Sequence, residues 1–201
     1  MKRLTARLAW LAGATMLTVS APAAAQFSDG YNFLKAVRDR DVQKAKALID
    51  KPGSTLVNSR DITSGETALM ISIKRRDAPW LAFLLQNGAD PNMKDNEGNT
   101  PLIVSSMSAF SDGVRLMLAG KAQVDATNGR GETALIKSVQ MKDAASVQLL
   151  LNAGADPDRR DSFAGMSARE YAARDIRSGP VAKLMTEAPK KEKKPSVGPS
   201  L

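Results

Sequence analysis

The sequence repeats itself with a period of 33 residues. A motif of glycine, any residue and a hydroxyl residue precedes an apolar or alanine-containing stretch at four regularly spaced places, where successive hydroxyl residues are 33, 33 and 34 positions apart. The hydroxyl residues are Thr67, Thr100, Thr133 and Ser167. A fixed period of this length is typical of solenoids, in which each unit buries its apolar face against its neighbours. A chain of 201 residues has room for at most six such units.

Within each period the residue types predict two helices joined by turns. A threonine before an apolar run can accept hydrogen bonds from the exposed N–H groups at the start of a helix. Pro101 directly follows Thr100, at the first helical position, where a missing N–H group is harmless. A second apolar run follows, and Gly88 and Gly154 come three positions after the last leucine of two of these runs. Glycine at such a position suits the left-handed conformation that ends many helices.

The third period departs from this pattern. Lys121 stands where the neighbouring periods have Gly88 and Gly154, so we expect a left-handed backbone penalty there unless Gly120 takes the turn instead. The stretch Ser111-Asp112-Gly113 is expected to loosen the start of the second helix, because glycine costs about 1 kcal/mol relative to alanine inside a helix. Two interpretations stay open: drift in a tolerant array, or a soft joint that adapts to a partner.

These motifs resemble the ankyrin repeat, whose signature runs G-x-T-P-L-H-x-A and then L-L-x-x-G-A-D-x-N. The stretches Gly98–Leu102 and Asn87–Asn92 carry the resemblance most fully, although the signature histidine is absent throughout. The resemblance covers about residues 30–187. It implies an all-α ankyrin repeat solenoid of stacked helix-turn-helix units with β-hairpin-like fingers, five units including two degenerate caps. The expected units are about 30–61, 62–94, 95–127, 128–160 and 161–187.

Both ends of the chain differ from the repeats. Residues 1–25 have a basic start, an apolar stretch of twelve residues and a run of small residues, which is the layout of a secretory signal peptide. We predict cleavage between Ala25 and Gln26, with an uncleaved anchor as the alternative. The alanine-rich style is bacterial, so we expect a periplasmic protein, with secretion as second choice. Residues 188–201 are rich in lysine and proline, which predicts a disordered tail.

Composition excludes much enzyme chemistry. The chain has no cysteine and no histidine, which rules out disulfides, thiolate metal sites, imidazole ligands and Ser-His-Asp triads. We therefore expect no catalytic residues, no cofactor and no metal. The net charge of +8 falls to +2 over residues 26–187, because the signal peptide and the tail hold most of the surplus. The charge is thus no argument for a nucleic-acid partner.

By the same resemblance, partners bind along the finger tips and the adjoining ends of the first helices. We expect a non-catalytic, monomeric module that binds an unidentified protein, with no transmembrane segment in the mature chain. The alternatives are an electrostatic binder of an anionic envelope surface through the tail, and an accessory protein that stabilises an envelope enzyme. The partner-binding candidates are Ile62, Thr63, Glu66, Lys74, Arg75, Lys94, Asn96, Glu97, Asn99, Met107, Ser108, Arg130, Glu132, Gln140, Met141, Arg160 and Phe163.

Five of these candidates have a second interpretation. Met107, Met141 and Phe163 are apolar residues at turns or helix ends, where they either bury against the next unit or form an adaptable contact strip. The basic run of residues 74–76 is either a solvated face or a contact for an acidic partner.

Overall fold

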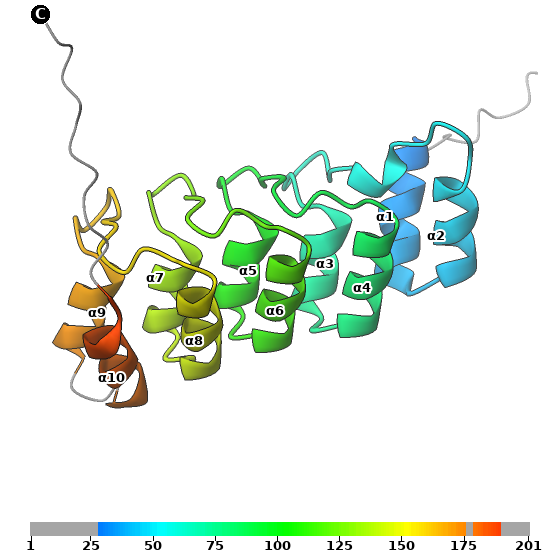
Figure 1. The fold of residues 1–201 in the computed structure, drawn as a ribbon. Helices are drawn as coiled ribbons and strands as arrows, with labels where there is room; N and C mark the ends of the chain where they lie inside the picture. The colour runs from blue at the N-terminus through cyan, green and yellow to red at the C-terminus, as the bar shows by residue number, and fades with distance from the viewer. Residues whose placement is uncertain (1–27, 176–178, 190–201) are drawn as a thin grey trace, which may run out of the picture.

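The structure, a computed structural model, describes residues 28–175 and 179–189. The predicted signal peptide and residues 190–201 of the predicted tail lie outside the described residues. The described part forms one row of helix pairs (Figure 1). The helices are α1 (Asp29–Asp39), α2 (Val42–Ile49), α3 (Ala68–Lys74), α4 (Ala78–Gln86), α5 (Pro101–Met107), α6 (Ser111–Ala119), α7 (Ala134–Gln140), α8 (Ala144–Asn152), α9 (Ala168–Arg174) and α10 (Gly179–Glu187), with a 3₁₀ turn, η1 (Leu56–Asn58).

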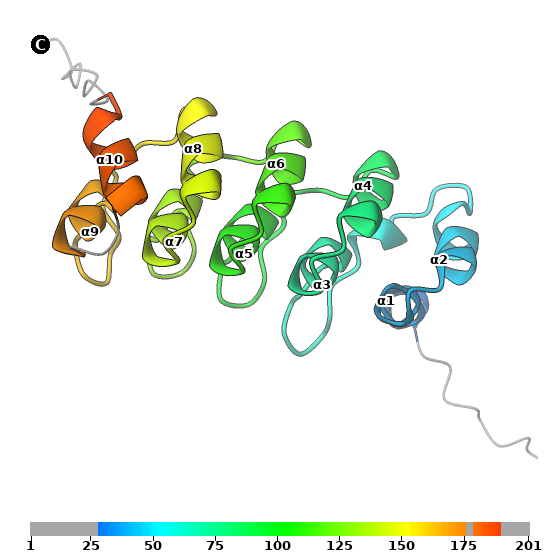
Figure 2. The same ribbon diagram turned by 90° about the horizontal axis from the view of Figure 1, so that it is seen from below.

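The helices lie in two layers. The first helices of the five units, α1, α3, α5, α7 and α9, form one layer, and the second helices form the other (Figure 2). Each inner first helix contacts its own partner and the first helices on both sides, as α5 contacts α3, α6 and α7. Between the described residues β pairing is limited to isolated bridges. The prediction of an all-α repeat solenoid is therefore confirmed.

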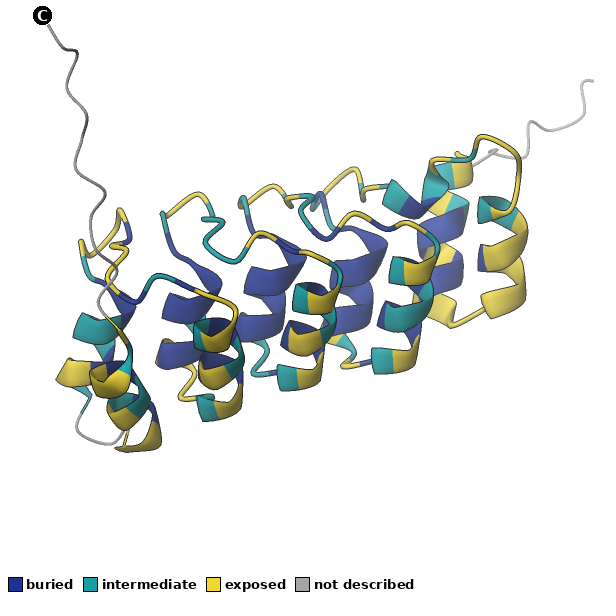
Figure 3. Ribbon diagram, in the orientation of Figure 1, coloured by how far each residue is buried: buried dark blue, intermediate teal, exposed yellow. Residues whose placement is uncertain are grey.

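The core runs through the first-helix layer. Residues that follow the threonines, such as Leu69, Leu102 and Leu135, are at most 1% exposed. The middle first helices are buried along most of their length, whereas the second helices turn one side to solvent (Figure 3). Because the apolar faces of each inner unit are covered by the units on both sides of it, stacking stabilises every unit in the row. Among the described residues, no helix combines the length and the hydropathy needed to cross a bilayer.

Helix starts follow the predicted capping chemistry. The hydroxyl oxygens of Thr67, Thr100 and Thr133 accept hydrogen bonds from the backbone N–H three residues later, at 3.2 to 3.4 Å. Ser167 does the same and forms a full capping box with Glu170. These caps satisfy N–H groups that would otherwise lack a partner within the protein interior. The capping role predicted for all four hydroxyl residues is confirmed.

The third unit departs from its neighbours at both ends of its second helix. Gly88 and Gly154 have φ angles of +83° and +86°, and Lys121 adopts the same left-handed backbone at +64°. Gly120 therefore does not take over the turn. Helix α6 has nine residues, like α4 and α8, but its first turn lacks the side-chain cap that Asp77 and Asp143 give to those two helices. A Cβ atom on Gly113 would lie 2.6 Å from Cδ1 of Phe110, which shows that this glycine makes room for an aromatic ring.

Candidate protein-binding surface

Loops before α3, α5, α7 and α9 form a row of fingers along one edge of the stack. Neighbouring fingers are joined by backbone hydrogen bonds of 2.8 to 3.0 Å. The fingers of units three and four approach each other so closely that glycine is required at Gly98. A Cβ atom at this position would lie 2.7 Å from the backbone nitrogen of Gly129. The joining bonds run from Asn96 to Ser64, from Gly129 to Glu97, and from Ser162 to Arg130. The fingers are therefore held in a regular row relative to one another.

A network of polar side chains crosses the base of the middle fingers. The side chain of Asn99 donates to Asp95 at 3.1 Å and accepts from the Asn128 amide at 3.1 Å. The Asn128 amide also donates to Glu132 at 2.9 Å. Glu132 in turn pairs with the ammonium group of Lys137 on α7 at 2.7 Å. The network thus links the finger of unit three to the first helix of unit four.

The ion pair at the end of this network is largely shielded from water. The side chains of Glu132 and Lys137 are 8% and 16% exposed. Burial opposes ionisation of Glu132, but the hydrogen bonds from Asn128 and Lys137 outweigh it and lower the pKa of the carboxyl group. Glu132 is therefore a charged and fixed group at neutral pH.

Other fingers hold their carboxylates in a similar way. A hydrogen bond from Arg38, together with backbone N–H groups of residues 63 and 64, lowers the pKa of Asp61 to about 2. Burial and a 2.7 Å hydrogen bond to Asp161 raise the pKa of Tyr171 to about 12. In both cases a side chain from a first helix fixes an aspartate in a finger. Arg38 on α1 holds the finger of the next unit, whereas Tyr171 on α9 holds the finger of its own unit.

Two adjoining hollows lie between the fingers and the first helices, and we call them together the finger groove. One has a volume of about 530 Å³ and the other about 500 Å³, and Glu97, Asn99 and Met107 line both. The first hollow is also lined by Thr63, Ser64, Glu66, Lys74, Asp95, Asn96, Val104 and Ser108. The second is also lined by Asn128, Arg130, Glu132 and Lys137.

The finger groove brings together ten of the predicted partner-binding residues from three units. They are Thr63, Glu66, Lys74, Asn96, Glu97, Asn99, Met107, Ser108, Arg130 and Glu132. Gln140 and Met141 are exposed at the end of α7, and the Gln140 carbonyl accepts from Lys137 at 3.3 Å. Met107 is 40% exposed, so it packs partly against its surroundings and partly faces solvent.

The remaining candidates lie outside the groove. Ile62, 98% exposed, lines a separate hollow of about 470 Å³ beside α1. Phe163 is 79% exposed, and the guanidinium group of Arg130 lies 5.6 Å from its ring centre. Arg160 pairs with Glu170, and Lys94 donates to the carbonyl of Thr127 in the next finger at 2.7 Å.

Arg75 has an internal structural role in this arrangement. Its guanidinium group donates to the carbonyl groups of Val37 and Arg38 at the end of α1, and it lies 3.4 Å from the carboxylate of Asp77. The next residue, Arg76, reaches in the opposite direction and donates to the carbonyl of Ala109 at 2.7 Å. This basic run therefore ties unit two to both of its neighbours.

Sequence reasoning missed several groove residues, of which Asp95, Val104 and Lys137 are the most informative. The period contains a signal for Lys137, because this position is Ile71 in unit two and Val104 in unit three. A lysine in a column that is otherwise apolar indicates a specific polar partner. Asp95 carries a weaker signal, since acidic or amide residues at finger starts also serve as turn residues.

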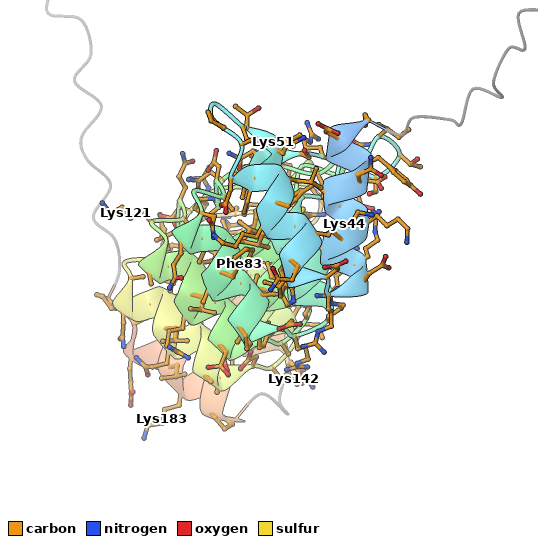
Figure 4. The ribbon with its side chains drawn as sticks, turned by 90° about the vertical axis from the view of Figure 1, so that its right-hand side faces the viewer. Lys44, Lys51, Phe83, Lys121, Lys142 and Lys183 are labelled. Carbon is orange, nitrogen blue, oxygen red and sulfur yellow. The ribbon has the colours of Figure 1, made fainter. Side chains whose placement is uncertain are left out.

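Positive charge is distributed around the stack. Viewed along the stack, the labelled residues Lys44, Lys51, Lys121, Lys142 and Lys183 lie on different sides of its periphery (Figure 4). Several lysines are also paired, as Lys142 is with Asp175 at 2.7 Å. This distribution differs from the clustered basic face that is typical of nucleic-acid binding domains.

Known proteins are similar to this chain over the repeats. The family model for ankyrin repeats (3 copies) matches residues 33–128 and 80–161. Neurogenic locus notch homolog protein 1 is 37% identical over 123 residues in Xenopus laevis and 34% in Homo sapiens, which is 60% of this chain and 5% of each relative. The ANK repeat-containing protein nipk-1 of Caenorhabditis elegans is 26% identical over 54% of this chain and 20% of its own length. The chain thus spans only a small part of these relatives.

Proposed function

Because the chain belongs to the ankyrin repeat family, whose members serve as protein–protein interaction modules, we propose that it is a non-catalytic module that binds a protein partner in the finger groove. The observation that carries this proposal is the groove itself. Side chains from three units line its two hollows, each has a volume of about 500 Å³, and Met107 lines both. A rigid row of fingers and a fixed polar network favour binding without rearrangement, which limits the entropy lost on association.

Affinity at such a surface comes from a few central side chains. Met107 lies at the junction of the two hollows and is partly exposed, so we expect it to be a principal contact. The surrounding polar groups then position the partner through hydrogen bonds and exclude water from the centre.

Site-specific photocrosslinking in cells tests the proposed surface. A photoreactive amino acid at Met107 should give a discrete crosslinked protein, whereas the same group at Arg115 on the outer helix α6 should not. Arg115 is a matched control because its side chain is well exposed, at 61%. Equal crosslinking from both positions, or none from Met107 in cells where the protein is abundant, contradicts the assignment.

We propose the bacterial periplasm as the place where this binding occurs. The proposal rests on the signal-peptide layout of residues 1–25 and on the absence of cysteine from the whole chain, which makes folding independent of the redox state of the compartment. Mass spectrometry of the protein from a periplasmic extract should show a chain that begins at Gln26. A chain that retains Met1 and fractionates with the cytoplasm contradicts this localisation.

A further inference from the structure

The centre of the finger groove differs in charge from its two sides. We propose that it selects a partner segment in which an apolar side chain lies next to a lysine or arginine, a specificity that rests on the proposed function of the groove. The apolar side chain would contact Met107, and the cation would reach the carboxylates of Asp95 and Glu97.

The repeat period shows why the centre is different. In unit two, Lys74 pairs with Glu66, and in unit four Lys137 pairs with Glu132. Unit three has Met107 at the position of Lys74, and Val104 at the position of Lys137. The first helix of the central unit therefore presents apolar groups where its neighbours present a cation.

The fingers nevertheless keep their carboxylates at this point. Asp95 and Glu97 line the 530 Å³ hollow, and neither forms an ion pair with another residue in the described part of the chain. The side chain of Glu97 accepts one hydrogen bond, from the amide of Asn99 at 3.2 Å. The carboxylate of Asp95 accepts three within its finger, from the backbone N–H groups of Glu97 and Asn99 and from the Asn99 amide, so Glu97 is the more accessible of the two carboxylates. By contrast, Asp61 in the preceding finger pairs with Arg38 at 2.7 Å.

The charge balance of this hollow is therefore negative. Three carboxylates line it, those of Glu66, Asp95 and Glu97, against the single ammonium group of Lys74, which already pairs with Glu66. A lysine or arginine from a partner complements this field, and an acidic segment is repelled by it. Because the hollow is open to solvent at Glu97, the carboxylate does not need to lose all its water before a cation arrives.

Met107 supplies the apolar half of the site. Its flexible thioether side chain adapts to aliphatic and aromatic partners alike, and Val104 lines the same hollow beside it. At such a site the apolar contact at the centre and the charged contacts at the margin both contribute to the affinity for the partner. The partner is thus a basic and apolar segment rather than an acidic one.

A random twelve-residue peptide library displayed on phage provides the probe, with the full chain as the bait. Enriched peptides should combine an aliphatic or aromatic residue with a lysine or arginine within about three positions. The strongest peptide is then synthesised with a fluorescent label, and its Kd is measured by anisotropy at low and high salt. Binding should weaken as salt rises, since the cation interacts with partly exposed carboxylates.

Two substitutions test the site directly. Met107→Lys places a cation where unit two already carries Lys74, so the fold should tolerate it, and it should weaken binding at least about tenfold, or about 1.4 kcal/mol. Glu97→Gln removes the charge and should weaken binding about three- to tenfold. Gln86→Lys on α4 is the matched control, because it adds the same charge at an exposed position on the second-helix layer.

The outcomes separate this inference from the proposed function. If Met107→Lys weakens binding but Glu97→Gln and the peptide cations have no effect, the groove binds partners and the proposed selectivity is wrong. Enrichment of acidic peptides, or of no peptide at all, also overturns the selectivity. If peptides bind wild type and both groove variants equally, the finger groove is not the binding surface, and the proposed function fails with it.

Discussion

The ion pair between Lys137 and Glu132 provides the sharpest test of how the finger groove is built. Replacing Lys137 by methionine keeps the length and the apolar stem of the side chain but removes its charge. Glu132 would then remain, 8% exposed, with the Asn128 amide as its main side-chain partner. A shielded carboxylate that loses its cation is strongly destabilising, since its desolvation is no longer compensated.

The magnitude follows from the burial of both groups. Breaking a fully buried pair by removing one partner costs about 3–5 kcal/mol, and Lys137 keeps 16% exposure, so we expect a loss of about 2–3 kcal/mol. Glu132→Gln should cost less, about 1 kcal/mol, because Lys137 also bonds to Gln140 and reaches solvent. The double variant should be more stable than the sum of the two losses predicts, by at least about 1 kcal/mol.

Urea denaturation followed by far-UV circular dichroism measures these losses, and pH adds a second readout. Loss of Lys137 removes one of the bonds that lower the pKa of Glu132. Stability that depends on a lowered carboxyl pKa is present above the unfolded pKa and disappears as the pH falls through the folded pKa. The difference in the free energy of unfolding between wild type and Lys137→Met should therefore be largest near neutral pH and should shrink below about pH 4. The reasoning is refuted if the stability losses of Lys137→Met and Glu132→Gln simply add in the double variant. It is also refuted if the difference in unfolding free energy between wild type and Lys137→Met does not change with pH.

Three further predictions concern single positions. Both Lys121 and Gly88 have left-handed backbones, which glycine adopts at lower cost than other residues. Lys121→Gly should therefore stabilise the protein by about 0.5–1 kcal/mol and Gly88→Ala should destabilise it by about 1 kcal/mol, so the urea midpoints of the two variants should move in opposite directions. Asp61→Asn should cost about 2 kcal/mol at neutral pH, a cost that disappears between about pH 5 and pH 2 in acid titrations, since the carboxylate contributes stability only while it is charged. Gly113→Ala should lower the thermal midpoint although alanine favours helices, because its Cβ atom would meet the Phe110 ring; an unchanged or raised midpoint contradicts the close packing.

Much of the fold could be predicted because the signals are local and repeated. A hydroxyl residue such as Thr100 followed by an apolar run defines a helix start within a few residues, and its recurrence every 33 residues defines the stack. The same recurrence shows that Lys121 is unusual, because the neighbouring units have glycine at this position. The close packing of Phe110 against Gly113 could not be predicted, because the direction of an aromatic side chain depends on the tertiary structure around it.

The candidate surface was predictable in outline and less so in detail. The resemblance to the ankyrin repeat placed Glu97, Asn99 and Met107 among the candidates, and they line the groove. Arg75 looked like a surface cation in the sequence, but its guanidinium group bonds to the end of α1, nearly forty residues earlier in the chain. Contacts of this kind depend on how units stack, and no short stretch of sequence specifies them.

The repeat length, the helix pairs, the caps and the apolar layer that faces the stack could be predicted from the residues, since each of these follows from interactions within one period. Which polar groups meet between periods depends on how the units stack. The tertiary structure pairs Lys137 with Glu132 and leaves Glu97 facing an open hollow beside Met107. The physical reason is that a solenoid places equivalent positions of successive units side by side, so the character of the groove comes from differences between neighbouring units.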